Sequence, residues 1–192
     1  MITTVTLNPA IDRTIVVSQF EYGSINRVAS SREDIGGKGI NVARILLALG
    51  SPSKAVGFIG KTNYQQVQTL LHNDAIQTEF VFIDAPTRTN IKLLESSKHT
   101  TTDINEAGFA VSEQELEAVM QLISSCSDKS TFIVFSGSVP NGLTTSIYRE
   151  MIEKLPANCK AALDADGILL VEGLKAEPFL IKPNIHELVH EY

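Results

Sequence analysis

The sequence contains no tryptophan, only two cysteines, and no apolar run that approaches the ~20 residues needed for a membrane-spanning helix. Cys126 and Cys159 lie far apart and show no CxxC or CxH spacing, which is typical of buried thiols in a reducing compartment. The N-terminus lacks a basic segment followed by an apolar run, so we expect no signal peptide. These absences predict a cytoplasmic protein that does not bind membranes.

Positive charge is scarce as well. The chain has 16 lysines and arginines against 22 aspartates and glutamates, which gives a formal net charge of -6. An overall field of this sign argues against nucleic-acid binding, although it is compatible with a small basic pocket for a phosphorylated metabolite. With 192 residues, of which 43% are hydrophobic, the sequence fits one globular domain with a sizeable core.

The order of the expected elements predicts an α/β fold. From Lys54 onward short strands alternate with helices, which is the pattern of a parallel sheet with helices on both faces. The segments at 11–31 and 88–104 break this alternation, and we expect them to form a small separate sheet with one strand around 25–31. The other expected strands lie at 2–7, 11–18, 54–59, 79–83, 89–95, 131–135, 160–163 and 178–181, and the expected helices lie at 40–49, 64–72, 112–125, 144–153, just after 164–167, and from Asn184.

Two helix boundaries are marked by their residue types. Ser112 and Glu115 have the spacing of a capping box, in which each side chain binds a backbone N–H group at the start of a helix. Gly50 follows an apolar helical stripe and is the expected stop of that helix.

Three glycines and a lysine precede a strongly apolar helix in the stretch GGKGIN, which begins at Gly36. The stretch is not a P-loop, because Arg32 stands where the first P-loop glycine belongs and Gly39 replaces the serine or threonine. One interpretation is an ordinary tight turn. The other is that backbone N–H groups at the positive end of a helix dipole face an anionic ligand, with Lys38 adding charge and Asn41 binding a hydroxyl.

Other candidate residues lie either after an expected strand, at the edge where open α/β sheets bind ligands, or along one face of a strand. Asp12 follows the first strand and can accept hydrogen bonds from two sugar hydroxyls. Arg88, Asn90 and Lys92 alternate along a strand and therefore share a face, and the forked guanidinium of Arg88 suits a phosphate. Each of these residues also has a plainer interpretation as part of an ordinary polar surface.

Asn184 and Glu187 lie three positions apart at an expected helix start, so they share a face. They could hold the water shell of magnesium, which prefers oxygen ligands, or they could be a capping asparagine and an exposed glutamate.

The loop at 136–142, SGSVPNG, supplies backbone N–H groups and hydroxyls. His186 and His190 have the spacing of a zinc pair but lack a third ligand, and we interpret them as solvated.

Together these motifs resemble the ribokinase-like sugar kinases of the phosphofructokinase-B type. The segments TLNPAIDRT, GGKGINVA, TRTNIK, TDINEAGF, SGSVPNG, LDADG and LIKPNIHEL occur in the family's order and at its spacing. The resemblance covers all 192 residues and implies a parallel α/β fold with a β-sheet lid, to which the segments at 11–31 and 88–104 would belong. It also implies a phosphorylated sugar as substrate, ATP and magnesium as cofactors, and a homodimer formed through the lid.

The resemblance assigns two groups of site residues. The substrate-binding residues would be Asp12, Arg27, Gly37, Lys38, Asn41, Arg88 and Ser138. The residues on the side of the nucleotide phosphates and magnesium would be Lys182, Asn184 and Glu187. LNPAID, GGKGIN and TDIN look most like members that phosphorylate fructose 1-phosphate, with tagatose-6-phosphate kinases as the alternative. Asp166 is a departure, because related sequences usually have a small hydroxyl residue or glycine in that part of the DADG segment.

A larger departure is that the family's GxGD motif does not occur in the sequence. In the family its aspartate takes the proton from the sugar hydroxyl that attacks the γ-phosphate, and members are longer than this chain. We therefore expect the chain to correspond to the N-terminal two-thirds of such a kinase, with little or no activity alone. The alternative is a sugar-phosphate-binding fragment that does not catalyse. We also expect poor solubility or dependence on a partner, because apolar strand and helix faces would stay uncovered.

Overall fold

The computed structural model describes residues 1–184 and has an α/β architecture with two separate sheets. The larger sheet has six strands, all parallel, in the order β10-β9-β8-β1-β4-β5. Its strands are β1 (Ile2–Thr6), β4 (Ser53–Gly60), β5 (Gln77–Ile83), β8 (Phe132–Ser136), β9 (Lys160–Asp164) and β10 (Leu180–Ile181). The parallel sheet predicted from the alternation of strands and helices is thus confirmed.

Helices cover both faces of the larger sheet. They are α1 (Lys38–Ala48), α2 (Tyr64–Asp74), α3 (Glu113–Ser127), α4 (Ile147–Glu153) and α5 (Gly167–Leu174). One core contains residues of α1 and α2 together with Ile59 of β4, and the other contains residues of α3, α4 and α5 together with Phe58 of the same strand. Because successive strand residues point to opposite faces, one strand contributes to both cores.

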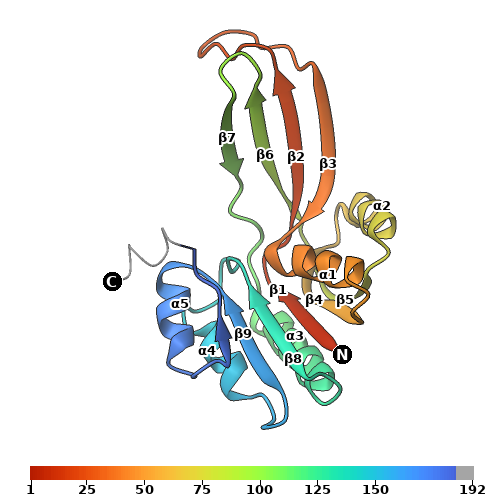
Figure 1. Ribbon diagram of the computed structural model, residues 1–192, viewed down its shortest axis with the longest axis vertical. Coiled ribbons are helices and arrows are strands. Elements are labelled where there is room, and N and C mark those ends of the chain that lie inside the picture. Colours follow the sequence, from red (N-terminus) through yellow and green to blue (C-terminus); the bar gives the residue numbers. More distant parts are fainter. Residues whose placement is uncertain (185–192) are drawn as a thin grey trace.

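The smaller sheet stands beyond the ends of the larger one and projects from the body of the molecule (Figure 1). Its strand order is β3-β2-β6-β7, with β2 parallel to β6 and the other pairs antiparallel. The strands are β2 (Ala10–Val17), β3 (Ser30–Gly36), β6 (Arg88–Glu95) and β7 (Thr100–Asn105). Since only three residues join β1 to β2, the chain passes directly from the carboxyl end of the larger sheet into the smaller one.

The strand expected around 25–31 lies further along the chain than predicted, as β3. Residues 18–29 instead form a loop that Asn26 closes, since its Oδ1 accepts the N–H of Glu21 at 2.9 Å and its Nδ2 donates to the Glu21 carbonyl at 2.8 Å. The sequence of β3, SSREDIG, does not predict a strand, because Ile35 is its only buried apolar side chain. The glycine stretch therefore begins inside a strand rather than in a loop.

The two marked helix boundaries are confirmed. Ser112 is the N-cap of α3, and both hydrogen bonds of its capping box with Glu115 are present. Gly50 follows α1 with a φ of 71°, and its N–H donates to the carbonyl of Leu47 at 2.9 Å. The helix expected from Asn184 falls on 185–192, which lie outside the described residues.

The edge strand β10 leaves apolar side chains uncovered within the described part of the chain. Phe179, Leu180 and Ile181 are 60%, 55% and 37% exposed. Phe179 packs edge-to-face on Phe132, with ring centroids 5.6 Å apart. Exposed apolar surface on a sheet edge is a known cause of association. The expectation of poor solubility stays a prediction, and this edge is its physical basis.

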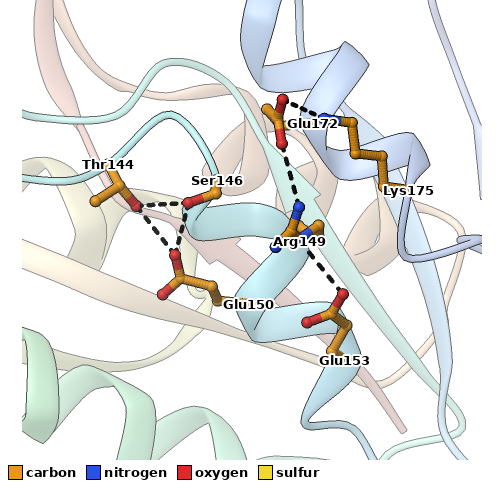
Figure 2. Close-up of polar contacts among 7 residues, drawn as sticks. All are labelled: Thr144, Ser146, Arg149, Glu150, Glu153, Glu172 and Lys175. Carbon is orange, nitrogen blue, oxygen red and sulfur yellow. Dashed lines mark hydrogen bonds and ion pairs between the residues drawn. The ribbon is translucent and has the colours of Figure 1, made fainter.

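The expected helix at 144–153 begins at Ile147, three residues later than predicted. Figure 2 shows the cause, because the hydroxyls of Thr144 and Ser146 both donate to Oε1 of Glu150, at 3.2 Å and 2.7 Å. Hydroxyl side chains that bind locally in this way favour a turn before the helix rather than the helix itself.

A chain of ion pairs joins α4 to α5 (Figure 2). Arg149 lies 3.4 Å from Glu153 on its own helix and 3.4 Å from Glu172 on α5, and Glu172 also binds Lys175 at 2.5 Å. The Glu172 side chain is only 19% exposed. Its hydrogen bond to Lys175, together with the charges of Lys175 and Arg149, lowers the pKa of the Glu172 carboxyl. Arg149 is the link between the two helices.

Replacing Arg149 with methionine should lower the melting temperature by a few degrees at neutral pH. The variant keeps an apolar stem but loses the charge that joins α4 to α5. Because the pKa of Glu172 is lowered in the folded state, its contribution is present above its unfolded pKa and is lost as the pH falls through the folded value. The difference from the wild type should therefore shrink in acid, which calorimetry at a series of pH values measures.

Lys154→Met is the matched control. It removes a positive charge from the C-cap of the same helix, and Lys154 forms no ion pair with the residues that the structure describes. Its melting temperature should stay close to that of the wild type. An equal loss in both variants, or a difference that persists in acid, would contradict the role of the ion pairs.

Candidate functional site

Polar side chains gather where strands of the larger sheet end and the smaller sheet begins. Ser136 and Asp164 end β8 and β9 and are paired in register. Asn8 follows β1, and Arg88 begins β6. Ligands bind at this edge in open parallel sheets. The arrangement therefore agrees with the strand-end motifs of the sequence.

The glycines of GGKGIN are required by contacts within the chain itself. A Cβ atom on Gly36 would lie 2.0 Å from Oδ2 of Asp12, and one on Gly39 would lie 2.5 Å from Oγ1 of Thr6. Gly37 combines a φ of 118° with a distance of only 2.6 Å from its hypothetical Cβ to Cγ2 of Thr6. The contacts of Gly37 and Gly39 with Thr6 bring the start of α1 directly against the end of β1. The tight-turn interpretation accounts for the glycines, and the same packing places a helix start at the strand ends.

The start of α1 favours negative charge. Its N-cap, Gly37, provides no side chain to bind the first N–H groups, and no acidic residue lies in its first turn. Lys38 is the first residue of the helix. A helix N-terminus of this kind attracts anions through its N–H groups and its dipole.

Two rows of polar residues cross the smaller sheet, with one residue from each strand in each row. The first row is Asp34, Asp12, Asn90 and Asn105, and the second row is Arg32, Thr14, Lys92 and Asp103. The rows lie two residues apart, so both occupy the same face of the sheet. Within the first row, Nδ2 of Asn90 donates to Oδ1 of Asp12 at 3.0 Å.

Both rows line a groove of about 630 Å³, together with Ile35, Asn41 and Arg44. Arg44 donates to Oδ1 of Asn41 at 2.5 Å and to the carbonyl oxygen of Ile35 at 2.9 Å, so it fixes the amide of Asn41. The groove thus presents mainly carboxylates, amides and cations. Such a lining suits a ligand with many hydroxyls.

The guanidinium of Arg88 is held at the base of the smaller sheet. It donates to the carbonyl oxygens of Glu106 at 2.8 Å and Asn8 at 3.1 Å, and to Oγ of Ser138 at 3.4 Å. Its Nε is buried and has no hydrogen-bond partner among the described residues. Burial lowers the pKa of Arg88, while the charges of Asp12 and Glu106 oppose that shift. Arg88 therefore supplies a partly desolvated positive charge with unused donor capacity.

Asn8 ties together the loops around Arg88. Its buried Nδ2 lies within hydrogen-bonding distance of the carbonyl oxygens of Ala107 and Val139, at 3.1 Å and 3.4 Å, and of Oγ of Ser138 at 3.3 Å. Gly108 packs so closely on Asn8 that a Cβ there would lie 2.4 Å from Oδ1. These contacts hold the surroundings of the guanidinium in place.

A buried carboxylate and two lysines form the other side of the site. Oδ1 of Asp164 lies 3.5 Å from Nζ of Lys38 and 3.2 Å from Nζ of Lys182. The Asp164 side chain is 10% exposed, whereas that of Lys182 is 69% exposed. Lys38 comes from α1 and Lys182 follows β10, so distant parts of the sequence converge on one carboxylate.

The structure brings most of the residues named from the resemblance to this region, with exceptions. Arg27 is exposed in the loop at 18–29, which joins the far ends of β2 and β3 (Figure 1). Asn184 is exposed beyond β10, and Glu187 lies outside the described residues. Among residues 1–184, no group of three or more histidine, cysteine, aspartate and glutamate side chains is arranged to hold a metal ion. None of the helices in that range has the length and apolar character to cross a bilayer.

Sequence reasoning did not assign a role to Asn8, Arg44 or Asp164. Asn8 and Asp164 belong to the strand-end motifs NPAID and DADG, so their position was an available signal. Arg44 lies three residues after Asn41, and this helical spacing could have identified it as a neighbour of Asn41.

Comparison with known proteins gives a consistent result. The family model for pfkB family carbohydrate kinases matches residues 5–191. The 1-phosphofructokinase of Borreliella burgdorferi is 38% identical over 188 residues, which cover 98% of this chain and 60% of that protein. The crystal structure of a possible 1-phosphofructokinase from Thermotoga maritima superposes with a TM-score of 0.89 at 30% identity, covering 97% of this chain and 61% of that one.

A more distant neighbour is Arabidopsis thaliana ribokinase complexed with ribose and ATP, with a TM-score of 0.70 at 18% identity over 97% of this chain and 61% of that one. At this identity the likeness shows the fold alone, which is the expected ribokinase-like fold. The chain spans about 60% of the length of the curated relative that it matches. The family model, by contrast, matches nearly the whole chain, and this confirms the resemblance found in the motifs. The chain belongs to the pfkB family of carbohydrate kinases.

Proposed function

We propose that this chain forms the sugar-phosphate-binding part of an ATP-dependent kinase that converts fructose 1-phosphate to fructose 1,6-bisphosphate. The observation that carries the proposal is that groups suited to sugar hydroxyls lie beside a group suited to phosphate. A row of hydroxyl-binding groups, including Asp12 and Asn90, lies beside the partly buried guanidinium of Arg88. Relatives named 1-phosphofructokinase support the choice of sugar phosphate.

The groove would bind the sugar through its hydroxyls. The carboxylate of Asp12 accepts hydrogen bonds from two hydroxyls, while the amides of Asn41 and Asn90 both donate and accept. Asn90 and Arg44 already hold Asp12 and Asn41, so these groups need little reorganisation when a ligand arrives. The backbone N–H groups at Gly37, the N-cap of α1, would complete this side of the site.

The sugar phosphate would lie toward Arg88, with Ser138 beside it and Lys38 at the start of α1. A guanidinium binds phosphate oxygens through two parallel hydrogen bonds, and partial burial strengthens this attraction. Arg27 would add charge only from another copy of the chain, because in one copy it lies in the distant loop at 18–29.

We also propose that the smaller sheet acts as a lid and as the contact of a homodimer. Its segments are those at 11–31 and 88–104. The loop at 18–29 supports this proposal, because two of its side chains are largely exposed, Tyr22 at 97% and Ile25 at 86%. Exposed apolar side chains in an ordered loop are typical of surfaces that bind another protein chain.

ATP would supply the transferred phosphoryl group when it is bound. Lys182 fits its phosphates, because it is a largely exposed ammonium at the strand ends. Asn184 and Glu187 would hold magnesium through its water shell, as magnesium keeps several waters in most phosphate sites. We also propose that the kinase acts in the cytoplasm, as the sequence leads us to expect.

The sequence has no GxGD aspartate, and no residue of this chain is assigned as the catalytic base. We expect the 192-residue chain to bind the sugar phosphate with little turnover, because a positioned base typically contributes ~10²–10⁴-fold to the rate. A coupled assay that showed the turnover of an ordinary kinase would contradict this expectation. The same assay on tagatose 6-phosphate, with the full kinase, tests the alternative substrate.

Replacing Arg88 with alanine should weaken fructose 1-phosphate binding by roughly 10- to 100-fold, because a hydrogen-bonded charged group contributes about 1.5–3 kcal/mol. Arg88→Lys should give an intermediate loss, since it keeps the charge but not the fork. Isothermal titration calorimetry of the folded variants measures both effects.

Arg13→Ala is the control for Arg88. Arg13 lies on the opposite face of the same sheet, where its side chain is paired with Glu33 at 3.6 Å. Its removal should leave the affinity unchanged. Wild-type affinity in Arg88→Ala would show that the phosphate does not bind at this guanidinium.

Gly36→Ala separates the two interpretations of the glycine stretch. The added methyl would lie 2.0 Å from Oδ2 of Asp12 and must displace that carboxylate. If Asp12 binds the sugar, the affinity for fructose 1-phosphate should fall by roughly 10- to 100-fold, since small misplacements of a binding group have effects of this size.

Gly50→Ala is the matched variant, because its φ of 71° is strained for alanine but its Cβ would meet no atom within 4 Å. It should lower stability and leave the affinity intact. Should Gly36→Ala behave in the same way, the glycine stretch would be a structural turn only.

A further inference from the structure

Asp164 is the most enclosed charged group at the strand ends, and the proposed sugar site does not use it. The residue as a whole is 7% exposed, and its Oδ1 lies within 3.5 Å of the ammonium groups of both Lys38 and Lys182. The resemblance places these lysines on different sides of the site, one with the sugar phosphate and one with the nucleotide. In the structure they meet at a single oxygen atom.

Packing beneath Lys38 fixes the path by which it reaches Asp164. A Cβ on Gly137 would lie 3.6 Å from Cβ of Lys38 and 3.7 Å from its Cγ, so the lysine stem runs over the glycine backbone. The N–H of Gly137 donates to the carbonyl oxygen of Asp164 at 2.9 Å, and the buried hydroxyl of Tyr148 donates to the carbonyl of Gly137 at 3.0 Å. The surface under the lysine is therefore tied to the strand that carries the carboxylate.

Lys182 is fixed in a similar way at its backbone. Its N–H donates to the carbonyl oxygen of Leu163 at 3.0 Å, which continues the pairing of β10 with β9. Leu163 directly precedes Asp164, so the backbone of Lys182 has little freedom relative to the carboxylate. The long side chain, by contrast, is 69% exposed and needs an attractive partner to stay in one place.

We propose that Asp164 is a positioning residue that holds the ammonium groups of Lys38 and Lys182 together and so creates a two-lysine site for a phosphate group at the start of α1. The site would take the terminal phosphate of the nucleotide, between the two substrates. This inference rests on the proposed kinase function. It adds that one carboxylate organises the cations that the reaction needs at the point of transfer.

The charges of the three groups favour a positioning role for Asp164 over a role in which it only neutralises one lysine. Two ammonium groups and one carboxylate leave a net charge of +1, and the start of α1 adds a positive helix dipole. A single lysine paired with Asp164 would instead be neutral and held by the carboxylate. Both lysines are therefore required before the cluster attracts a phosphate.

The test is the affinity of the 192-residue chain for inorganic pyrophosphate, measured by calorimetry for the wild type and for Asp164→Asn. The variant gains one unit of net positive charge, so simple electrostatics predicts tighter binding. The positioning role predicts the opposite, a loss of roughly tenfold, which is the size of the loss seen when the partner that orients a metal-binding side chain is removed. Asp164→Asn binding that equals or exceeds wild-type binding would overturn the proposal.

Asp166→Asn is the matched control. It makes the same change in charge two residues away, at an exposed aspartate that forms no ion pair with either lysine among the described residues. Its pyrophosphate affinity should equal or slightly exceed that of the wild type. A tenfold loss in this control would assign the effect to general charge or folding rather than to the lysine pair.

Lys38→Met and Lys182→Met keep the test decisive if Asp164→Asn does not fold. Loss of either lysine leaves the other neutralised by Asp164, so each single variant should lose nearly as much pyrophosphate affinity as the double variant. Additive losses would show two independent lysines and overturn the proposal, as would a wild-type chain that binds no pyrophosphate at millimolar concentrations. Binding of fructose 1-phosphate to the same samples reports separately on the proposed function.

Discussion

Direct contact between the start of α1 and the end of β1 is the constraint on which the whole site depends. At Gly36, Gly37 and Gly39, any Cβ atom would lie within 2.6 Å of an atom of Thr6 or Asp12. Only glycine allows this approach, and the approach places a positive helix start at the carboxyl edge of the larger sheet. The same glycines leave room for the carboxylate of Asp12. A structural need for close packing and a functional need for an open, positive surface are met by one set of residues.

Charge and hydrogen bonding divide the site into two parts. On the smaller sheet, the polar row that runs from Asp34 to Asn105 presents carboxylates and amides, which suit sugar hydroxyls. On the larger sheet, Asp164 gathers two lysines near the same helix start. Arg88 lies between these regions and contacts both the loop after β1 and the loop after β8. Phosphoryl transfer depends mainly on positioning and on stabilisation of charge, and the described residues provide groups for both.

Much of the fold was predictable from the sequence, because strand and helix alternation and the capping box at Ser112 are local signals. The position of β3 was not, because its strand pairs through backbone groups while its side chains are mainly charged and exposed. The motifs identified Asp12 at a strand end, Lys38 and Asn41 at a helix start and Arg88 on a strand face as candidate site residues. They did not show that Lys38 and Lys182 share Asp164, since such contacts depend on tertiary structure rather than on spacing along the chain.

Arg27 illustrates the limit of assigning roles by motif. The resemblance implied a role for it at the substrate, yet in one copy it lies in a loop at the opposite end of the smaller sheet (Figure 1). Asn8 illustrates the converse, since a residue with no assigned role fixes the carbonyl groups and the hydroxyl around Arg88. In both cases the position of the residue relative to the smaller sheet decides whether it reaches the site, since Arg27 lies beyond the far end of β2 and Asn8 lies just before its start.

The central claim is that a sugar phosphate binds between the polar rows and the start of α1. Its most direct test is a titration of the isotopically labelled chain with fructose 1-phosphate, followed through its backbone amide resonances. The site described here predicts saturable shifts at Asp12, at Gly37 to Asn41 and at Arg88, with no change in α4 and α5. Shifts confined to other parts of the chain, or none at saturating sugar phosphate, would contradict it.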